Sequence, residues 1–382
     1  MSGHVVVAGA GITGAATALA LTEAGFAVTL LDRAAAGSAV SGASLACLGT
    51  HMSSEIELPQ LIWATRRWAE WDRRFAGAFH YRRCGQIRFI EHEADIPVAE
   101  HWIALERAAG LTPELLTRER LRRVEPALTG PLVAASWSPT DALVNPFLAV
   151  RCLISAAVAA GARFRSHCPV EAIDVAGGRV TGVVTPGGRI AADAVVVTGG
   201  PWTAELVAPL GVALPILPRK AQCLATIRQP VTIRGVVGGC KSDHGGVDAG
   251  YTQIQQSEAG QILFNTVLAG GLSEAGAQGH VPEVDRRFVL DSIDTLTRLF
   301  PALRAVELLR SWVRYEAVTP DDRFIVGPVG PAGLLVAAGD NGTGFCRAPV
   351  IGEVIAAALS GRPCAIDSAP YDPGRFPAAG AT

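Results

Sequence analysis

The feature that most constrains the fold is a strand–turn–helix–strand pattern within the first 33 residues. The apolar run at residues 5–7 is typical of a buried strand. A helix-forming run at residues 15–24 and a second apolar run at 26–31 follow it, and the second run ends at Asp32. Between the first strand and the helix lie three glycines at G-x-G-x-x-G spacing, Gly9, Gly11 and Gly14. The order predicts a parallel βαβ unit with a tight glycine turn.

Each part of this pattern has a physical task in binding a dinucleotide. Gly9 allows the turn, Gly11 lets the backbone approach a pyrophosphate, and Gly14 brings the helix close to the strand. The helix N-terminus offers N–H groups and partial positive charge to the pyrophosphate. Asp32 is placed to accept hydrogen bonds from a ribose. The alternative is a glycine-rich turn in another kind of α/β protein, but the strand, the helix and the acid together favour a dinucleotide.

Composition limits the remaining choices. A chain of 382 residues suits two domains, and 49% apolar with 18% charged residues indicates a well-buried globular protein. A net charge of −2 gives no electrostatic reason to expect nucleic acid or an acidic membrane as a partner. The eight cysteines show no C-x-x-C spacing, so we expect reduced thiols and no metal site. Because the first 22 residues lack a basic region, we expect a cytoplasmic protein without a signal peptide or a transmembrane segment.

Further along the chain, periodicity and turn residues predict helices and strands in alternation. Helices are expected at 58–75, 94–125, 146–161, 283–300 and 350–359. Strands are expected at 163–175, 178–185, 189–197, 308–315 and 333–338, together with a strand pair at 81–91 that bends at Gly85. The proline-rich segment after residue 363 is expected to lie on the surface.

Six blocks of sequence, in the same order, resemble the FAD-dependent D-amino-acid oxidase superfamily, in particular glycine oxidases, monomeric sarcosine oxidases and related bacterial amine dehydrogenases. The blocks are VVVAGAGITGAATALAL, SGASLACLGTH, VNPFLAVRCLISAAVAAGARF, VVVTGGPWTAELVAPLGVALPILPRKAQ, RSWVRYEAVTPDDRFIVGP and GDNGTGFCRAPVIGEVIAAALSG. The resemblance implies an α/β and α+β protein with a Rossmann-type FAD-binding domain built from discontinuous segments. The substrate domain would rest on a large antiparallel or mixed sheet that roofs the flavin. The implied division is 1–80, 140–212 and 318–365 for FAD, 81–139 and 213–317 for the substrate, and 366–382 as a tail.

The same resemblance assigns residues to the cofactor. The glycine motif and Asp32 would hold the ADP half, and residues 339–344 would wrap the flavin. The implied cofactor-binding residues are Gly9, Gly11, Ile12, Thr13, Gly14, Asp32, Arg33, Ser41, Ser44, Ala46, Val170, Gly200, Trp202, Gly339, Asn341, Gly342, Thr343, Gly344 and Phe345. In monomeric sarcosine oxidases the position of Arg314 holds the cysteine that bonds the flavin covalently. Since that cysteine is absent here, we expect noncovalent FAD.

The expected substrate site departs from the family. Glu316 stands where many glycine-oxidase-like sequences have the arginine that fixes the substrate carboxylate, and Arg314 lies two residues earlier on the same strand face. Arg314 is therefore the candidate carboxylate ligand, with an ion pair to Glu316 or another acid as the alternative. The full set of candidate substrate-binding residues is Arg314, Glu316, Tyr251, Gln253, His51 and Arg347. A hydrogen-bonded structural role is the alternative for His51, and a solvent-facing side chain is the alternative for Arg347.

The resemblance implies oxidation of the α C–N bond of glycine, an N-substituted glycine or a D-amino acid, by hydride transfer to flavin N5 and later hydrolysis of the imine. No residue is assigned as an acid or a base. The electron acceptor would be molecular oxygen or an electron-transfer partner. Two alternatives stay open: a catalytic subunit of a heteromeric FAD dehydrogenase for opine-like or imino acids, and a noncatalytic flavin-binding subunit. The oligomeric state also stays open.

Overall fold

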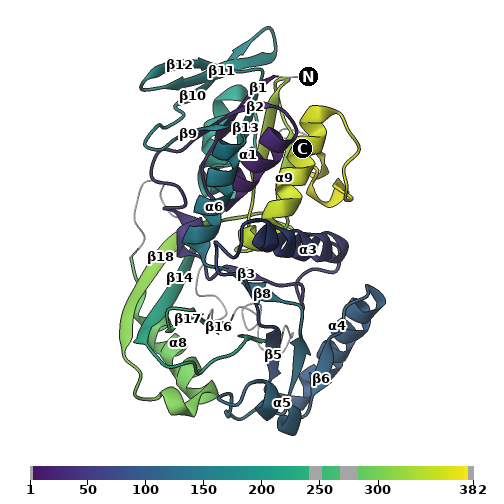
Figure 1. The fold of residues 1–382 in the computed structure, drawn as a ribbon, viewed down its shortest axis with the longest axis vertical. Helices are drawn as coiled ribbons and strands as arrows, with labels where there is room; N and C mark the ends of the chain where they lie inside the picture. The colour runs from purple at the N-terminus through teal and green to yellow at the C-terminus, as the bar shows by residue number, and fades with distance from the viewer. Residues whose placement is uncertain (1–2, 241–251, 267–282, 377–382) are drawn as a thin grey trace.

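The computed structural model describes residues 3–240, 252–266 and 283–376, and two large β-sheets organise this part of the chain (Figure 1). Helices cover the first sheet and the outer face of the second. The helices in the described ranges are α1 (Ile12–Glu23), α2 (Val40–Ala43), α3 (Leu58–Arg74), α4 (Ile96–Ala108), α5 (Arg118–Val124), α6 (Pro146–Ala159), α7 (Thr203–Val207), α8 (Arg286–Leu299) and α9 (Gly344–Ser360).

The glycine turn lies at the centre of the first sheet, whose order in the described chain is β19-β20-β13-β1-β2-β9. Its strands are β1 (His4–Ala8), β2 (Ala27–Leu31), β9 (Arg163–Arg165), β13 (Ala194–Val197), β19 (Ile325–Pro328) and β20 (Leu334–Ala338). The pairings are parallel except for the edge strand β19, which runs antiparallel to β20. The predicted Rossmann-type sheet built from discontinuous segments is confirmed. All these strands fall in the segments predicted for the FAD-binding domain, and the exact domain division stays a prediction.

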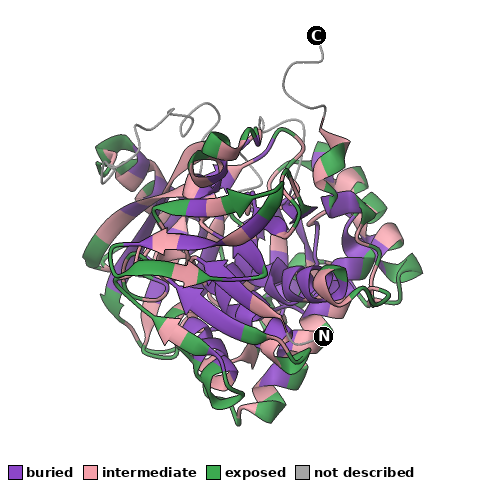
Figure 2. Cartoon of the chain, turned by 90° about the horizontal axis from the view of Figure 1, so that it is seen from above, coloured by how far each residue is buried: buried purple, intermediate pink, exposed green. Residues whose placement is uncertain are grey.

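Side chains of the central strands alternate between two cores, as the period of two requires. Val5 and Val7 pack with α1, α6 and α9 on one face. Val6 packs on the other face against a three-stranded antiparallel sheet of β10 (Ala172–Ala176), β11 (Arg179–Thr185) and β12 (Gly188–Ala191). Buried residues therefore fill the interior, while exposed residues follow the outer strands and helix faces (Figure 2).

The second sheet has the order β18-β14-β17-β16-β15-β5-β7-β6 in the described residues and is mixed, since β5 and β15 are parallel. Its strands are β5 (Gln86–Ile90), β6 (Glu114–Leu116), β7 (Ala134–Ser138), β14 (Leu217–Arg228), β15 (Val236–Gly239), β16 (Gln253–Gln256), β17 (Gln261–Asn265) and β18 (Leu308–Val318). One face packs on α5 and α8 through apolar residues such as Phe264 and Leu296. Residues of opposite parity, such as Gln253, face the FAD-binding half. A small sheet of β3 (Cys47–Leu48), β8 (Ala142–Leu143) and β4 (Arg82–Arg83) lies between the two halves.

Four sequence-based expectations differ from the structure. The helix expected at 94–125 is wrong, because α4 ends near Gly110, which has φ +85°, and β6 intervenes before α5. The strand expected at 163–175 divides into β9 and β10, and the strand expected at 189–197 divides into β12 and β13; in both cases the two strands belong to different sheets. The tail after residue 363 does not lie wholly on the surface, because Tyr371 is fully buried.

Candidate active site

A cleft of about 850 Å³ opens where β1 and β2 end and α1 begins. Ligands of open α/β sheets bind at the carboxyl ends of the strands, which is where this cleft lies. The turn after β13 and the residues that follow β20 form its other walls. The predicted cofactor residues that line the cleft are Gly9, Gly11, Ile12, Thr13, Asp32, Arg33, Ser41, Val170, Gly200, Trp202, Gly339 and Gly344.

Two glycines of the turn have no room for a side chain. Gly9 has φ +117°, and a Cβ there would lie 2.5 Å from the carbonyl oxygen of Thr198. A Cβ on Gly14 would lie 1.8 Å from the carbonyl oxygen of Gly9. Gly14 therefore packs the helix against the turn instead of lining the cleft. This close packing leaves the N-terminus of α1 facing the cleft, where it can bind a phosphate group.

The end of the cleft nearest β2 is bordered by Asp32 and by a stacked pair, Arg33 and Trp202. Asp32 accepts hydrogen bonds from the backbone N–H groups of Ala10, at 2.6 Å, and Ala34, at 2.8 Å. Its carboxylate thus ties the end of β2 to the glycine turn. The guanidinium carbon of Arg33 lies 3.8 Å from the ring centroid of Trp202, which is a cation–π distance.

A second, smaller cavity of about 180 Å³ continues from the cleft beneath the second sheet. Ile12, Ser41, Arg314, Asp340 and Gly344 line both spaces, so the two are adjacent. The other predicted residues that line the smaller cavity are Ser44, Ala46, Gly342, Thr343, Phe345, Gln253, Glu316, His51 and Arg347. Tyr251 lies outside the described residues. A cleft that continues into a roofed pocket suits a long cofactor whose reactive end meets a small substrate.

Asn341 lines neither cavity, and its amide fixes the loop that does. Asn341 has φ +46°, a left-handed conformation that asparagine tolerates better than most residues. Its side chain accepts a hydrogen bond from the N–H of Thr319 at 2.9 Å and donates one to the carbonyl of Gly339 at 2.7 Å. The contact joins the 339–344 loop to the T-P-D turn that follows β18.

Arg314 and Glu316, the two charged candidates on β18, have different partners in the structure. Glu316 pairs with Arg219, directly across the strand pair on β14, at 2.9 Å. The guanidinium of Arg314 donates to the carbonyl of Val313 at 2.7 Å, and in the described ranges no carboxylate lies within ion-pair distance of it. The alternative of an ion pair between Arg314 and Glu316 therefore does not occur. Arg314 is a cation at the junction of the two cavities.

Asp340 supplies a carboxyl group at the same junction. Burial raises the pKa of Asp340 to about 7, and the negative charge of Glu316 adds to the rise. The backbone N–H of Ala317 donates to Asp340 at 2.8 Å and opposes the rise in pKa. Near neutral pH this carboxyl group is therefore present in both its protonated and its ionised form at the junction of the two cavities.

The raised pKa of Asp340 predicts a pH-dependent stability. Its ordinary value is 3.8, so between about pH 4 and pH 7 the folded state binds more protons than the unfolded state, and the free energy of unfolding falls as the pH rises. We expect Asp340→Asn to reduce this fall, as measured by urea unfolding at about pH 5 and about pH 8. The same pH dependence in the wild type and the variant would contradict the assignment.

Arg347 is buried and does not face solvent. Its guanidinium forms two hydrogen bonds with the carboxylate of Glu57, at 2.7 and 2.6 Å. Burial alone would raise the pKa of Glu57, but the hydrogen bonds and the charge of Arg347 outweigh burial and lower it. Both side chains are at most 4% exposed, so the pair joins the first turn of α9 to the start of α3 inside the protein. Arg347 thereby positions the helix whose N-terminus faces the cleft.

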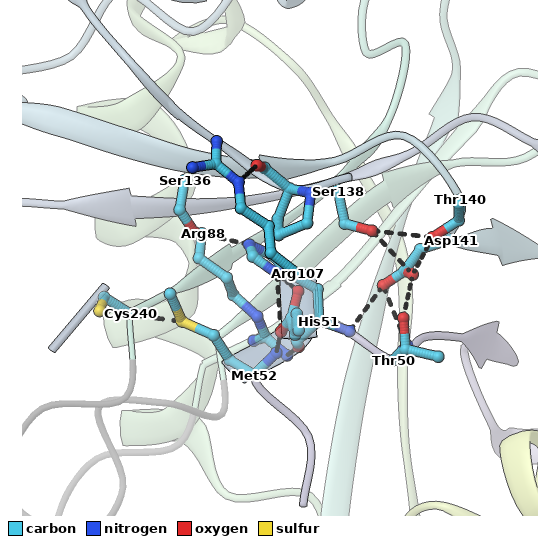
Figure 3. A network of polar contacts seen from close by, with 12 residues as sticks. Thr50, His51, Met52, Arg88, Arg107, Ser136, Ser138, Thr140, Asp141 and Cys240 are labelled. Atoms are coloured by element: carbon cyan, nitrogen blue, oxygen red, sulfur yellow. Dashed lines mark hydrogen bonds and ion pairs between the residues drawn. The ribbon is translucent and has the colours of Figure 1, made fainter. Parts of the chain in front are cut away.

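His51 belongs to a buried polar network below the smaller cavity (Figure 3). Its Nδ1 lies 2.8 Å from Glu106, and its Nε2 lies 2.5 Å from the hydroxyl of Ser136. The order resembles a serine–histidine–acid triad. Ser136 is fully buried on β7, so its hydroxyl has no access to a substrate. Since both ring nitrogens have partners, the geometry favours the structural role of His51.

Sequence reasoning missed Arg88, a cation that lines the smaller cavity. It lies on β5, and its side chain reaches into the buried network, where the guanidinium donates a hydrogen bond to the carbonyl of His51 at 3.3 Å (Figure 3). Burial lowers the pKa of Arg88, although the negative charges of Asp141 and Glu106 oppose this shift. The signal was the alternation in β5, where Gln86 and Arg88 face opposite to Ile87 and Phe89.

The sequence of residues 4–358 matches the model of the family described as FAD dependent oxidoreductase. The chain belongs to this family. A D-amino acid dehydrogenase from Bradyrhizobium diazoefficiens is 30% identical to this oxidoreductase over 291 residues, which cover 75% of this chain and 65% of that enzyme. The matched region thus spans just under two thirds of that relative. The predicted relationship to D-amino-acid oxidase-type flavoproteins is confirmed.

Solved structures confirm the fold of this FAD-dependent oxidoreductase. The L-proline dehydrogenase from P. horikoshii has a TM-score of 0.89 and 24% identity, and the alignment covers 98% of both chains. The glycine oxidase from Geobacillus kaustophilus has a TM-score of 0.86 and 23% identity, with 98% of this chain and 100% of that chain covered. At these identities the likeness concerns the fold and not the substrate.

The cleft of this oxidoreductase suits FAD, the cofactor of its family. The glycine turn leaves backbone N–H groups at the start of α1, the Asp32 carboxylate lines the cleft where it could bind a ribose, and the smaller cavity has room under a polar roof. Among the described residues, no helix is long and apolar enough to cross a bilayer. The described ranges also contain no cluster of His, Cys, Asp or Glu that would hold a metal ion.

Asp32→Ala tests the nucleoside end of the cleft. The substitution leaves the N–H groups of Ala10 and Ala34 without their acceptor and removes the predicted ribose ligand. We expect FAD to dissociate about 10- to 100-fold more readily, which corresponds to the loss of a buried hydrogen-bond acceptor. Fluorescence of released FAD measures the change, with Asp174→Ala on the outer strand β10 as the control. An unchanged dissociation constant would remove Asp32 from the site.

Proposed function

We propose that this FAD-dependent oxidoreductase oxidises the α C–N bond of a small amine that carries a carboxylate: glycine, an N-substituted glycine or a D-amino acid. The observation that carries the proposal is Arg314, a cation without a carboxylate partner in the described chain, at the junction of the cofactor cleft and the smaller cavity. The name of the relative from Bradyrhizobium diazoefficiens, a D-amino acid dehydrogenase, supports the same class of substrate.

The residues of the chain would bind and orient the substrate. Arg314 would hold the carboxylate by charge-assisted hydrogen bonds. Glu316, fixed by Arg219, would accept a hydrogen bond from the amine or from a cationic group of a larger substrate. The polar face of the second sheet would cover the site and exclude water. Bound FAD supplies the two-electron acceptor. The binding energy would thus be used to aim the substrate C–H bond at the reactive ring.

Noncovalent attachment of FAD belongs to the same proposal. Arg314 occupies the position of the cysteine that bonds flavin in sarcosine oxidases. Cys47, Cys223 and Cys346 line the smaller cavity, and burial raises the pKa of all three thiols, to about 12 for Cys223 and Cys346. They stay protonated at neutral pH, and the thiol is a much weaker nucleophile than the thiolate. Acid precipitation should therefore release the FAD into the supernatant, and retention of yellow colour in the pellet would contradict this.

An anaerobic substrate screen tests the proposed reaction. Holoenzyme is mixed with glycine, sarcosine, D-alanine, D-proline and N-carboxyalkyl amino acids, and loss of the flavin absorbance is recorded. We expect at least one of these substrates to bleach the flavin. If dithionite bleaches the flavin and none of the amines does, the noncatalytic flavin-binding subunit becomes the better proposal.

The electron acceptor decides whether the enzyme is an oxidase or a dehydrogenase. The relatives named D-amino acid dehydrogenase favour an acceptor other than oxygen. Once a substrate is known, hydrogen peroxide formation under air is compared with reduction of an artificial quinone. A dehydrogenase would reduce the quinone faster, and stoichiometric hydrogen peroxide would identify an oxidase.

A further inference from the structure

A second crevice, of about 730 Å³, lies away from the cofactor. It is formed by α5, the 128–132 segment, α8 and the short turn after α8. These elements pack on the face of the second sheet that points away from the FAD-binding half. The crevice shares no lining residue with the cofactor cleft or the smaller cavity. Whatever it binds is therefore separate from the proposed amine.

The crevice is strongly basic, although the chain as a whole carries a net charge of −2. Its lining holds one acid, Asp294, and Glu91 pairs with one of the arginines from outside. Even with both acids counted, the arginines are in excess by two. The arginines that converge from the separate elements are Arg118, Arg122, Arg298 and Arg304. A concentration of one charge in a concave site attracts ions of the opposite charge.

Two of the guanidinium groups are held in place and two are available. Arg118 donates to the carbonyl of Leu132 at 2.7 Å, and Arg298 pairs with Glu91. In the part of the chain that the structure describes, Arg122 and Arg304 form no ion pair with a carboxylate. An ion in the crevice would therefore meet two fixed guanidinium groups and two that no carboxylate of the described chain holds.

The floor of the crevice is rigid and apolar. The N–H of Gly130 donates to the carbonyl of Leu299 at 3.0 Å, and a Cβ on Gly130 would lie 2.5 Å from the carbonyl oxygen of Arg298. This contact fixes the 128–132 segment on the end of α8 and occupies a terminal helix carbonyl that would otherwise repel an anion. Leu121, Leu128 and Leu132 are buried beneath it. A floor that is already fixed costs no further backbone ordering when a ligand binds.

We propose that this crevice is a second ligand site, which binds a small polyanion with two or more phosphate or carboxylate groups. Arginine binds both groups through paired N–H donors, so the two chemistries share the site. The volume lies within the range of small-molecule sites, about 300–1,000 Å³. A single small anion would leave most of the crevice empty, whereas a polyanion can contact arginines on opposite walls.

Calorimetry on the FAD-saturated protein tests the site, because bound FAD prevents phosphates from entering the cofactor cleft. Tripolyphosphate, citrate and inorganic phosphate are titrated separately. We expect tripolyphosphate or citrate to bind at one site and more tightly than inorganic phosphate, and the better of the two identifies the preferred group. Absence of binding by both polyanions would overturn the proposal.

Two sets of variants connect the binding to the crevice. Arg122→Gln with Arg304→Gln is expected to weaken polyanion binding about tenfold or more, through loss of two charge-assisted contacts. The control, Arg151→Gln with Arg163→Gln, removes the same charge from exposed positions in the FAD-binding half. An equal loss in both double variants would show a general charge effect and overturn the site. Retained flavin absorbance verifies folding, and Arg122→Gln alone replaces the pair if the double variant unfolds.

Discussion

Arg347→Met is expected to lower the free energy of unfolding by about 3–5 kcal/mol, because it leaves the carboxylate of Glu57 buried without its partner. The pair is bidentate and almost inaccessible to solvent. It also connects α9 to α3, so we expect the variant to retain FAD less well. Urea unfolding followed by circular dichroism measures the loss of stability.

The chain offers a matched control for this prediction. Arg362 forms a bidentate pair with Glu353 at 2.7 Å, but the arginine side chain is 41% exposed. Arg362→Met should therefore cost about 1 kcal/mol or less. A double variant with Glu57→Gln and Arg347→Met should recover part of the lost stability, since no charge stays unpaired. Equal effects of Arg347→Met and Arg362→Met would show that burial does not decide the contribution.

Arg314→Met is expected to reduce kcat/KM for a carboxylate-bearing amine by a factor equivalent to about 2–4 kcal/mol, or about 30- to 700-fold. The physical reason is the loss of a charge-assisted contact in a site that excludes water. The measurement is the rate of flavin bleaching at several substrate concentrations, compared for an amino acid and for an amine without a carboxylate.

Arg310 provides the control for Arg314, because it lies on the same strand but lines neither cavity. Arg310→Met should leave kcat/KM nearly unchanged. If Arg314→Met slows the carboxylate-free amine as much as the amino acid, the residue acts on the cofactor or the fold instead of the substrate carboxylate. An unchanged kcat/KM for both amines would remove Arg314 from the site.

Local patterns predicted the cofactor half of this protein well. The spacing of Gly9, Gly11 and Gly14 reflects contacts within one turn, and the structure shows how little space two of these glycines have. The helix predicted at 58–75 is α3, Leu58–Arg74, because its apolar periodicity extends over several turns. The prediction of one helix over 94–125 was wrong, because the charged residues on both sides of Gly110 suggested a continuous helix although the chain turns at this glycine. Elements that depend on contacts between residues close in the sequence could therefore be predicted from the sequence alone.

The substrate half depends on contacts between distant residues, which no local pattern contains. Arg347 meets Glu57 across 290 residues, and Arg219 meets Glu316 across 97. The sequence predicted Arg347 and Glu316 as site residues. It gave no indication that Glu57 would pair with the first or Arg219 with the second. Strand alternation would have placed Arg88 on the same face as Gln86, but which face meets the cavity follows only from the assembled sheet.

The order of the first sheet has a consequence for how the protein acquires its cofactor. Strand β20 pairs with β13, although about 140 residues separate them in the chain, and the loop after β20 forms one wall of the cleft. A ribosome must therefore translate the chain through residue 344 before every wall of the cleft exists. Because domains fold as units during synthesis, FAD capture has to be a late event, and a nascent chain stalled before β20 should not retain the flavin.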